Sequence, residues 1–170
     1  MIKSILFFVT MSIVSPGITQ SPGVTTYSNA YYGFEFDYPS TWHQLTYPGS
    51  VVLVSEPAGK ELSNQATFDV AIDSVSHDVG SFCTSYESSI RTGEVFSDFK
   101  ILSKQDTMFC GVPAIEYHCT ATAAGLPMEW KSVVVGHRGR ILKLSTASLV
   151  GFFLLKHETT DAIFQSFRLQ

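Results

Sequence analysis

The chain has 170 residues, the length of one typical domain, and 45% of its residues are hydrophobic while only 15% are charged. This composition supplies enough apolar surface for a packed core and argues against a disordered chain. The formal net charge is −4 and no run of Lys or Arg occurs, which argues against nucleic acid and anionic membrane surfaces as partners.

The first twenty residues have the layout of a secretory signal peptide. Lys3 supplies a positive charge, residues 5–14 are apolar, and residues 15–17 provide small side chains for cleavage. The apolar run is about half of the roughly 20 residues that a membrane-spanning helix needs. We therefore expect cleavage near Gly17–Gln20 and an extracytoplasmic protein, secreted or periplasmic, with no membrane span. An uncleaved anchor and a buried N-terminal helix are the alternatives.

Residues 21–26 are rich in Pro, Gly, Ser and Thr, which predicts a linker between the signal peptide and one domain over residues 27–170. Within that domain, alternating apolar and polar residues predict strands at 32–38 and 68–73, and a short apolar run predicts one at 51–54. From Asp78 to Ile90 the apolar residues recur with helical spacing instead. This change of period predicts an amphipathic helix.

Alternation resumes after the helix. Strands are predicted at 100–109, 114–120, 128–134 and 141–148, and turns at 111–112 and 137–140 join them into two hairpins. A last helix is predicted from about 155 to 167. Because the turns are too short for crossovers, we expect the class α+β, with a mostly antiparallel central sheet of about six to seven strands.

The chain has three cysteines, Cys83, Cys110 and Cys119. If the protein is exported they share an oxidising compartment, yet an odd number leaves at least one thiol free. Cys110 is expected at a turn and Cys119 far along the return strand, so these two lie too far apart to bridge. The sequence thus predicts a disulfide from Cys83 to Cys110 or Cys119, with three buried apolar thiols as the alternative.

Catalytic signatures are absent from the sequence. It contains no Gly-x-Ser-x-Gly, and none of its five histidines belongs to a known local signature. His118 and Cys119 do not make a zinc pair, because adjacent residues of a strand point to opposite faces. No glycine-rich loop suits a phosphate. We therefore expect neither an enzyme nor a bound organic cofactor.

A set of carboxylates predicts a cation site instead. If the apolar residues of the alternating strands face one core, six carboxylates share the opposite side of the sheet. The apolar residues are Phe34, Phe36, Phe68, Val70, Ile72, Ile115, Tyr117, Met128 and Trp130. The carboxylates are Glu35, Asp37, Asp69, Asp73, Glu116 and Glu129. Hard divalent cations such as calcium prefer clustered carboxylate oxygens. The alternative is a solvated polar face whose charge Lys131 balances.

Trp42 and Tyr47 form a second candidate site, an aromatic contact surface near Pro39 and Pro48. Tyr and Trp are favoured at interfaces because they combine apolar area with a polar tip. The alternative is that Trp42 closes one end of the core.

Three stretches of the sequence belong together as a pattern. They are Tyr27-Ser28-Asn29 leading through Tyr32-Gly33-Phe34-Glu35-Phe36 to Tyr38-Pro39-Ser40-Thr41-Trp42, then Gly111-Val112-Pro113-Ala114, and finally Ile163-Phe164-Gln165-Ser166-Phe167. In this order they resemble the PsbP-like family, named for an extrinsic subunit of photosystem II and including exported bacterial relatives. The resemblance covers nearly all of the chain after the leader.

The resemblance implies a central antiparallel sheet with helices on both sides, as an α/β/α sandwich, and a role in binding. The functional hypothesis is therefore a non-enzymatic exported accessory domain that binds a protein or a cell-envelope component. A photosystem II-associated extrinsic protein with a cation-related role and an enzyme of unrecognised type are the alternatives. The leader has neither the Ser/Arg-rich character of a chloroplast transit peptide nor a lipid-bearing cysteine.

Overall fold

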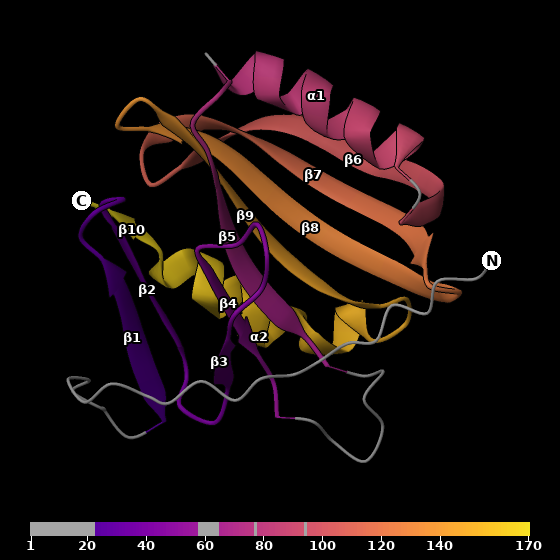
Figure 1. The fold of residues 1–170 in the computed structure, drawn as a ribbon. Helices are drawn as coiled ribbons and strands as arrows, with labels where there is room; N and C mark the ends of the chain where they lie inside the picture. The colour runs from indigo at the N-terminus through magenta and orange to yellow at the C-terminus, as the bar shows by residue number, and fades with distance from the viewer. Residues whose placement is uncertain (1–22, 58–64, 77, 94) are drawn as a thin grey trace.

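The computed structural model describes residues 23–57, 65–76, 78–93 and 95–170. The predicted signal peptide, residues 1–20, therefore lies outside the described residues. The described chain folds into a seven-stranded sheet, a three-stranded sheet and two helices (Figure 1).

The seven-stranded sheet is antiparallel throughout, in the order β3-β4-β5-β9-β8-β7-β6. Its strands are β3 (His43–Leu45), β4 (Val52–Ser55), β5 (Thr67–Asp73), β6 (Phe96–Phe109), β7 (Val112–Ala123), β8 (Leu126–His137) and β9 (Arg140–Leu149). The turns from β6 to β9 are Cys110-Gly111, Ala124-Gly125 and Arg138-Gly139. Both residues of each turn have positive φ, with glycine second, as tight hairpin turns require. The predicted antiparallel sheet is thus confirmed.

The three-stranded sheet contains β1 (Val24–Asn29), β2 (Phe34–Pro39) and β10 (Arg168–Leu169), in the order β1-β2-β10. β1 begins inside the predicted linker, so that prediction is wrong from Val24 onward. Thr25 is buried within this strand. Short polar side chains fill most of β1, so the sequence shows no apolar alternation there.

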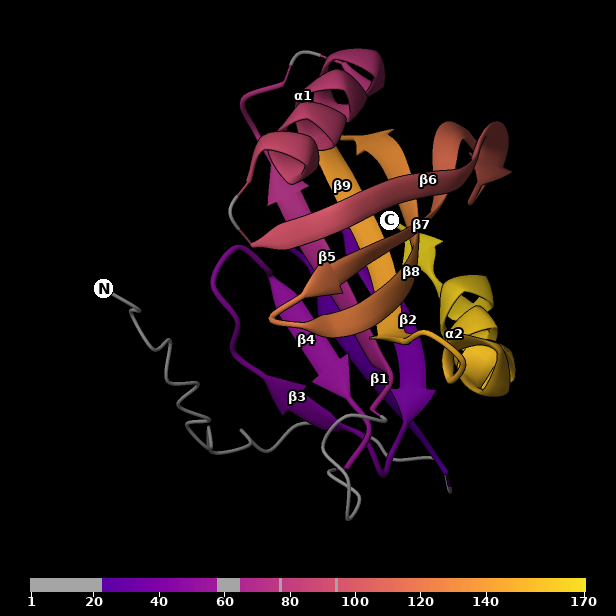
Figure 2. The ribbon, with the colours of Figure 1, turned by 90° about the vertical axis from the view of Figure 1, so that its right-hand side faces the viewer.

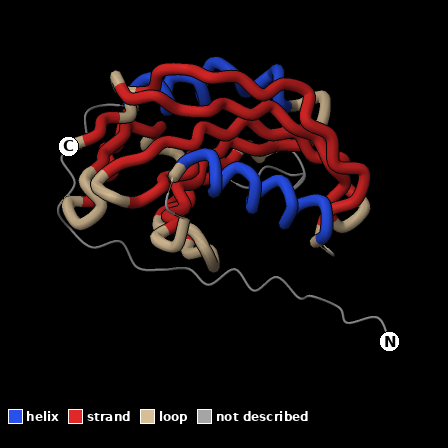
Figure 3. The backbone as a smooth tube through the Cα atoms, turned by 90° about the horizontal axis from the view of Figure 1, so that it is seen from above, coloured by secondary structure: helices blue, strands red, loops and turns tan. Residues whose placement is uncertain are grey.

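The two helices are α1 (Val79–Thr92) and α2 (Phe153–Ser166). Asp78 caps the start of α1, because its carboxylate accepts the N–H of Ser81 at 2.7 Å. Figures 2 and 3 show α1 and α2 on different sides of the large sheet. On the side of α2, the covering layer consists of the helix and the three-stranded sheet together. The predicted sandwich, in which helices alone cover both faces of one sheet, is therefore too simple.

The seven-stranded sheet buries apolar side chains on both of its faces. One cluster, beneath α2 and β2, includes Phe34, Phe36, Phe68, Val70, Leu142, Leu144 and Ile163. The other, beneath α1, includes Cys83, Ile90, Tyr117, Cys119, Trp130 and Val134, with Ile115 and Met128 packed against it. The expectation of one core is therefore wrong. Alternation divides a strand's residues between two faces but does not say which faces of different strands coincide.

The closing motif of the chain joins α2 to β2. The Ser166 hydroxyl accepts the N–H of Asp37 at 2.9 Å and lies 2.8 Å from the carbonyl oxygen of Ile163, to which it donates. β10 pairs with β2 only at Phe34 and Glu35. Ser166 therefore provides a hydrogen-bond partner for the β2 backbone at Asp37, just beyond the paired residues. The next residue, Phe167, stacks on the ring of Phe34 with 5.3 Å between centroids.

Replacing Ser166 with alanine leaves the Asp37 N–H without its acceptor. We expect Ser166→Ala to lower the free energy of unfolding by about 1–2 kcal/mol. The exposed neighbour Gln165 is the matched control, and Gln165→Ala should change the same free energy by less than about 0.5 kcal/mol. Urea unfolding of both variants measures the difference, and equal stabilities would contradict the role given to Ser166.

Candidate binding pocket

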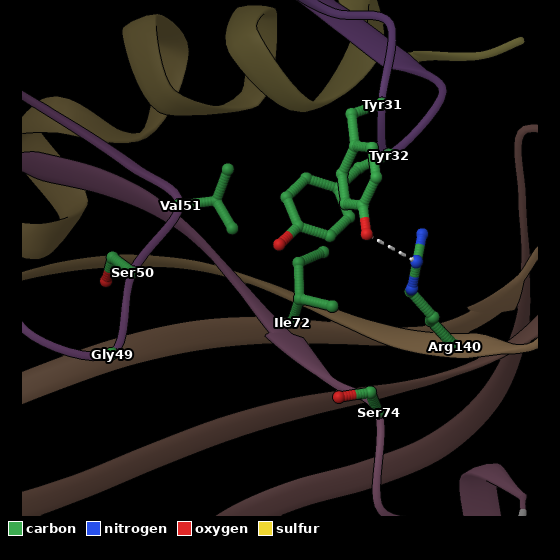
Figure 4. A pocket seen from close by; sticks show the side chains of 8 residues that line it. All are labelled: Tyr31, Tyr32, Gly49, Ser50, Val51, Ile72, Ser74 and Arg140. Carbon is green, nitrogen blue, oxygen red and sulfur yellow. Dashed lines mark hydrogen bonds between the residues drawn. The ribbon is translucent and has the colours of Figure 1, made fainter.

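A pocket of about 260 Å³ lies where four segments of the chain meet. They are the β1–β2 turn, the β3–β4 loop, the end of β5 and the start of β9. Figure 4 shows Tyr31, Tyr32 and Arg140 grouped on one side of it, with Val51 and Ile72 beside Tyr32. The pocket is therefore lined by two phenols, one guanidinium and an apolar wall.

The β1–β2 turn has a fixed shape that presents the two tyrosines. The side-chain oxygen of Asn29 accepts the N–H of Tyr32 at 3.1 Å, and its backbone oxygen accepts the N–H of Gly33 at 2.8 Å. Gly33 has φ +72, and a Cβ added there would lie 2.5 Å from the guanidinium carbon of Arg138. Glycine therefore lets the turn close tightly over the β8–β9 hairpin.

Arg140 is the charged group of the pocket. Its Nη2 donates to the Tyr31 hydroxyl at 3.2 Å, and its guanidinium carbon lies 4.8 Å and 5.1 Å from the ring centroids of Tyr31 and Tyr32. These contacts with neutral rings orient the guanidinium without neutralising it. None of the ion pairs within the described part of the chain includes Arg140. Tyr31 is 70% exposed and Arg140 is half-buried, so a partner can reach this hydrogen-bonded pair from solvent.

The opposite wall of the pocket is hydrogen-bonded to a carboxylate that is shielded from water. Ser50 lines the pocket, and its hydroxyl donates to Asp69 at 3.2 Å. Burial raises the pKa of Asp69, and the charge of Lys143 and the hydrogen bond from Ser50 offset this only in part. The Val51 N–H donates to the Val70 carbonyl at 2.8 Å, which holds the same loop against β5.

The raised pKa of Asp69 has a consequence for stability. Its contribution to folding is fully present below the ordinary aspartate pKa of 3.8 and is lost as the pH rises through the raised value. We therefore expect Asp69→Asn to raise the melting temperature at neutral pH, with a gain that shrinks as the medium is acidified.

Asp73 is the control for this prediction because its pKa shifts in the opposite direction, below the ordinary value. Hydrogen bonds from the Ser76 hydroxyl and the Val75 N–H lower the pKa of Asp73. Its contribution is present above the ordinary aspartate pKa and is lost on acidification, so Asp73→Asn should lower the melting temperature at neutral pH. Melting curves between about pH 3.5 and pH 8 compare the two variants. A lower melting temperature of Asp69→Asn at neutral pH would contradict a raised pKa of Asp69.

The six predicted carboxylates lie in three places. Glu35 and Asp37 are on β2 and pair with Arg168, at 2.6 Å and 3.2 Å. Asp69 and Asp73 are on the α1 face of β5, as their register with β9 shows. Glu116 and Glu129 lie on the opposite face of the large sheet.

The expected shared face is therefore wrong, because β2 belongs to another sheet and the remaining strands present different faces. Glu116 pairs with Lys131 at 3.2 Å and Glu129 with His118 at 2.7 Å. Within residues 23–57, 65–76, 78–93 and 95–170, no three His, Cys, Asp or Glu side chains form a group that suits a metal ion. Divalent-cation binding stays a prediction from the sequence.

All three cysteines are free thiols, so the structure does not contain the predicted bridge from Cys83 to Cys110 or Cys119. Cys83 and Cys119 are buried beneath α1, whereas Cys110 is exposed at its turn with Sγ 3.1 Å from the Phe167 carbonyl oxygen. Burial raises the pKa of each thiol, that of Cys119 to about 12. None of the three therefore has the lowered pKa of a thiol nucleophile.

Trp42 and Tyr47 differ in their exposure to solvent. Trp42 is only 6% exposed and belongs to the core beneath α2, while Tyr47 is half exposed. Trp42 is therefore not part of the predicted aromatic surface. It belongs to the core, which was the alternative given for this residue. Tyr31 and Arg140 were not predicted from the sequence, because they lie 109 residues apart. The adjacent aromatic residues Tyr31 and Tyr32, at the start of the predicted strand, were the one visible signal.

The comparisons with known proteins agree on the fold. The solution structure of cyanobacterial PsbP from Synechocystis sp. PCC 6803 matches with a TM-score of 0.68 at 14% identity, over 93% of this chain and 99% of that one. The chain has the PsbP-like fold. No protein-family model and no curated protein sequence matches it.

Two further structures with the PsbP-like fold come from different organisms. LpqN from Mycobacterium tuberculosis, described as involved in cell envelope biogenesis, has a TM-score of 0.62 at 11% identity, over 86% of this chain and 90% of its own. The Ran-binding protein Mog1p from Saccharomyces cerevisiae has a TM-score of 0.59 at 6% identity, over 86% and 95%. At these identities the likeness concerns the fold alone. Neither α1 nor α2, the helices of the described residues, has the length and apolar character to cross a membrane.

Proposed function

We propose that this chain is an exported, non-catalytic binding domain whose pocket receives a carboxylate-bearing side chain from a partner protein. The observation that carries the proposal is the guanidinium of Arg140, oriented by Tyr31 and Tyr32 and left without an ion pair among the described residues. A guanidinium presents parallel N–H donors that match the two oxygens of a carboxylate.

The size of the pocket favours a side chain over a larger ligand. Its volume of about 260 Å³ is below the roughly 300–1,000 Å³ of pockets that enclose drug-sized molecules. One carboxylate side chain with an adjacent apolar group would fill it. The carboxylate would meet Arg140 and Tyr31, and the apolar group would pack on Val51 and Ile72.

Two further considerations support a binding role outside the cytoplasm. The raised pKa of all three thiols disfavours thiol catalysis, and the sequence has no hydrolase signature. Export rests on the layout of the leader, and a protein with the same fold, LpqN, is described as involved in cell envelope biogenesis. A cell-envelope protein is therefore the kind of partner we propose.

Peptide titrations test the chemistry of the pocket. The probes are capped pentapeptides with a central Asp or Glu beside Phe or Leu, and the same peptides with Asn or Gln instead. We expect the acidic peptides to bind at least about tenfold more tightly, a difference of about 1.4 kcal/mol. Arg140→Ala should abolish the difference, and Tyr31→Phe should reduce it.

Arg91 provides the matched control, because it is exposed on α1, contacts Phe99 and is absent from the pocket lining. Arg91→Ala should leave peptide affinity unchanged. Equal affinity of the wild type and Arg140→Ala for acidic peptides, with equal melting temperatures, would overturn the proposal.

A further inference from the structure

β6 is an edge strand of the seven-stranded sheet and pairs only with β7 among the described strands. It is 14 residues long, and the run Leu102–Asp106 is exposed without interruption. Leu102 and Met108 have exposed fractions of 53% and 63%. A long edge with free backbone N–H and C=O groups is a template for pairing with another strand.

The two halves of β6 differ in how well they can pair. Register shifts against β7 occur between Ser97 and Lys100 and between Ile101 and Ser103, and such bulges hinder pairing at an edge. From Ser103 to Phe109 the register is regular. The regular half is therefore the part of the edge that can accept a further strand.

The sequence of this half is complementary to itself. In an antiparallel pair of two copies centred on Gln105, Lys104 of one copy lies opposite Asp106 of the other. Ser103 lies opposite Thr107, and Leu102 opposite Met108. A charge pair and a hydroxyl pair thus form on each side of the two-fold axis, and such cross-strand pairs stabilise sheets.

Neighbouring registers lose this match. A pair centred on Lys104 places two ammonium groups against each other on the axis, and a pair centred on Asp106 places two carboxylates there. Like charges directly opposite destabilise a strand pair. The opposite edge of the sheet, β3, has three residues, and short edge strands are poor templates.

We infer that the protein forms a two-fold symmetric dimer in which β6 pairs antiparallel with β6 of a second copy, centred on Gln105. The two seven-stranded sheets then form one continuous sheet. Residues that lie opposite each other in this register belong to the same face of β6, so the α1 faces of the two copies lie on the same side. Lys104 already contacts Glu87 at 2.8 Å within its own copy. Its ammonium would lie between that carboxylate and Asp106 of the other copy.

Sedimentation equilibrium of the purified protein tests this dimer. We expect a concentration-dependent monomer–dimer equilibrium in the wild type and a dimer at least about tenfold weaker in Asp106→Lys, where lysines face each other. The double variant Lys104→Glu with Asp106→Lys restores opposite charges and should regain most of the affinity. Glu158→Lys is the control, because it makes the same charge change on the exposed surface of α2 and should dimerise normally.

Cross-linking tests the register. In a Cys110→Ser background, Gln105→Cys places identical thiols opposite each other on the axis, where Cβ atoms of facing residues lie about 4.5–5.5 Å apart. Mild oxidation should produce a covalent dimer, while Gln44→Cys on β3 should not. A wild type that stays monomeric at every concentration would overturn the inference. So would a dimer that neither Asp106→Lys nor Gln105→Cys affects.

Discussion

Burial of the large sheet on both faces is the constraint on which the other features depend. One face packs against α1, and the other packs against α2 and β2. Phe34 and Phe36 bind β2 to that second face, and Phe167 stacks on both, with 5.3 Å and 5.9 Å between ring centroids. Because β2 is fixed in this way, the turn before it must lie over the β8–β9 hairpin. The pocket is therefore a consequence of the core.

The same constraint explains how the pocket acquires its charge. The β8–β9 hairpin carries Arg138 and Arg140, and both approach the β1–β2 turn. Arg138 takes the space that a side chain at Gly33 would fill, and Arg140 takes the space beside Tyr31. Two segments from opposite ends of the chain thus bring aromatic rings and guanidinium groups together, although the chain as a whole is acidic. This local arrangement, rather than the net charge of the chain, gives the pocket its positive group.

Much of the fold followed from local patterns in the sequence. The helix after Asp78, the strands from 100 to 148 and the final helix all have clear periods, and the structure places elements at each of them. β1 and β10 could not be predicted from the sequence, because neither has an apolar alternation of its own. Both exist only through pairing with β2. The carboxylates were assigned to one face for a related reason. Period two cannot show that Glu35 belongs to a different sheet from Asp69.

The pocket lay beyond local patterns, because Tyr31 and Arg140 meet only through the tertiary fold. Side-chain NMR of the Arg140 guanidinium measures its role most directly. On titration with an acidic peptide, we expect the Nε–Hε signal of Arg140 to shift and to saturate with the binding curve, while that of Arg91 stays in place. An unchanged Arg140 signal in a protein that binds the peptide would show that Arg140 does not hold the carboxylate.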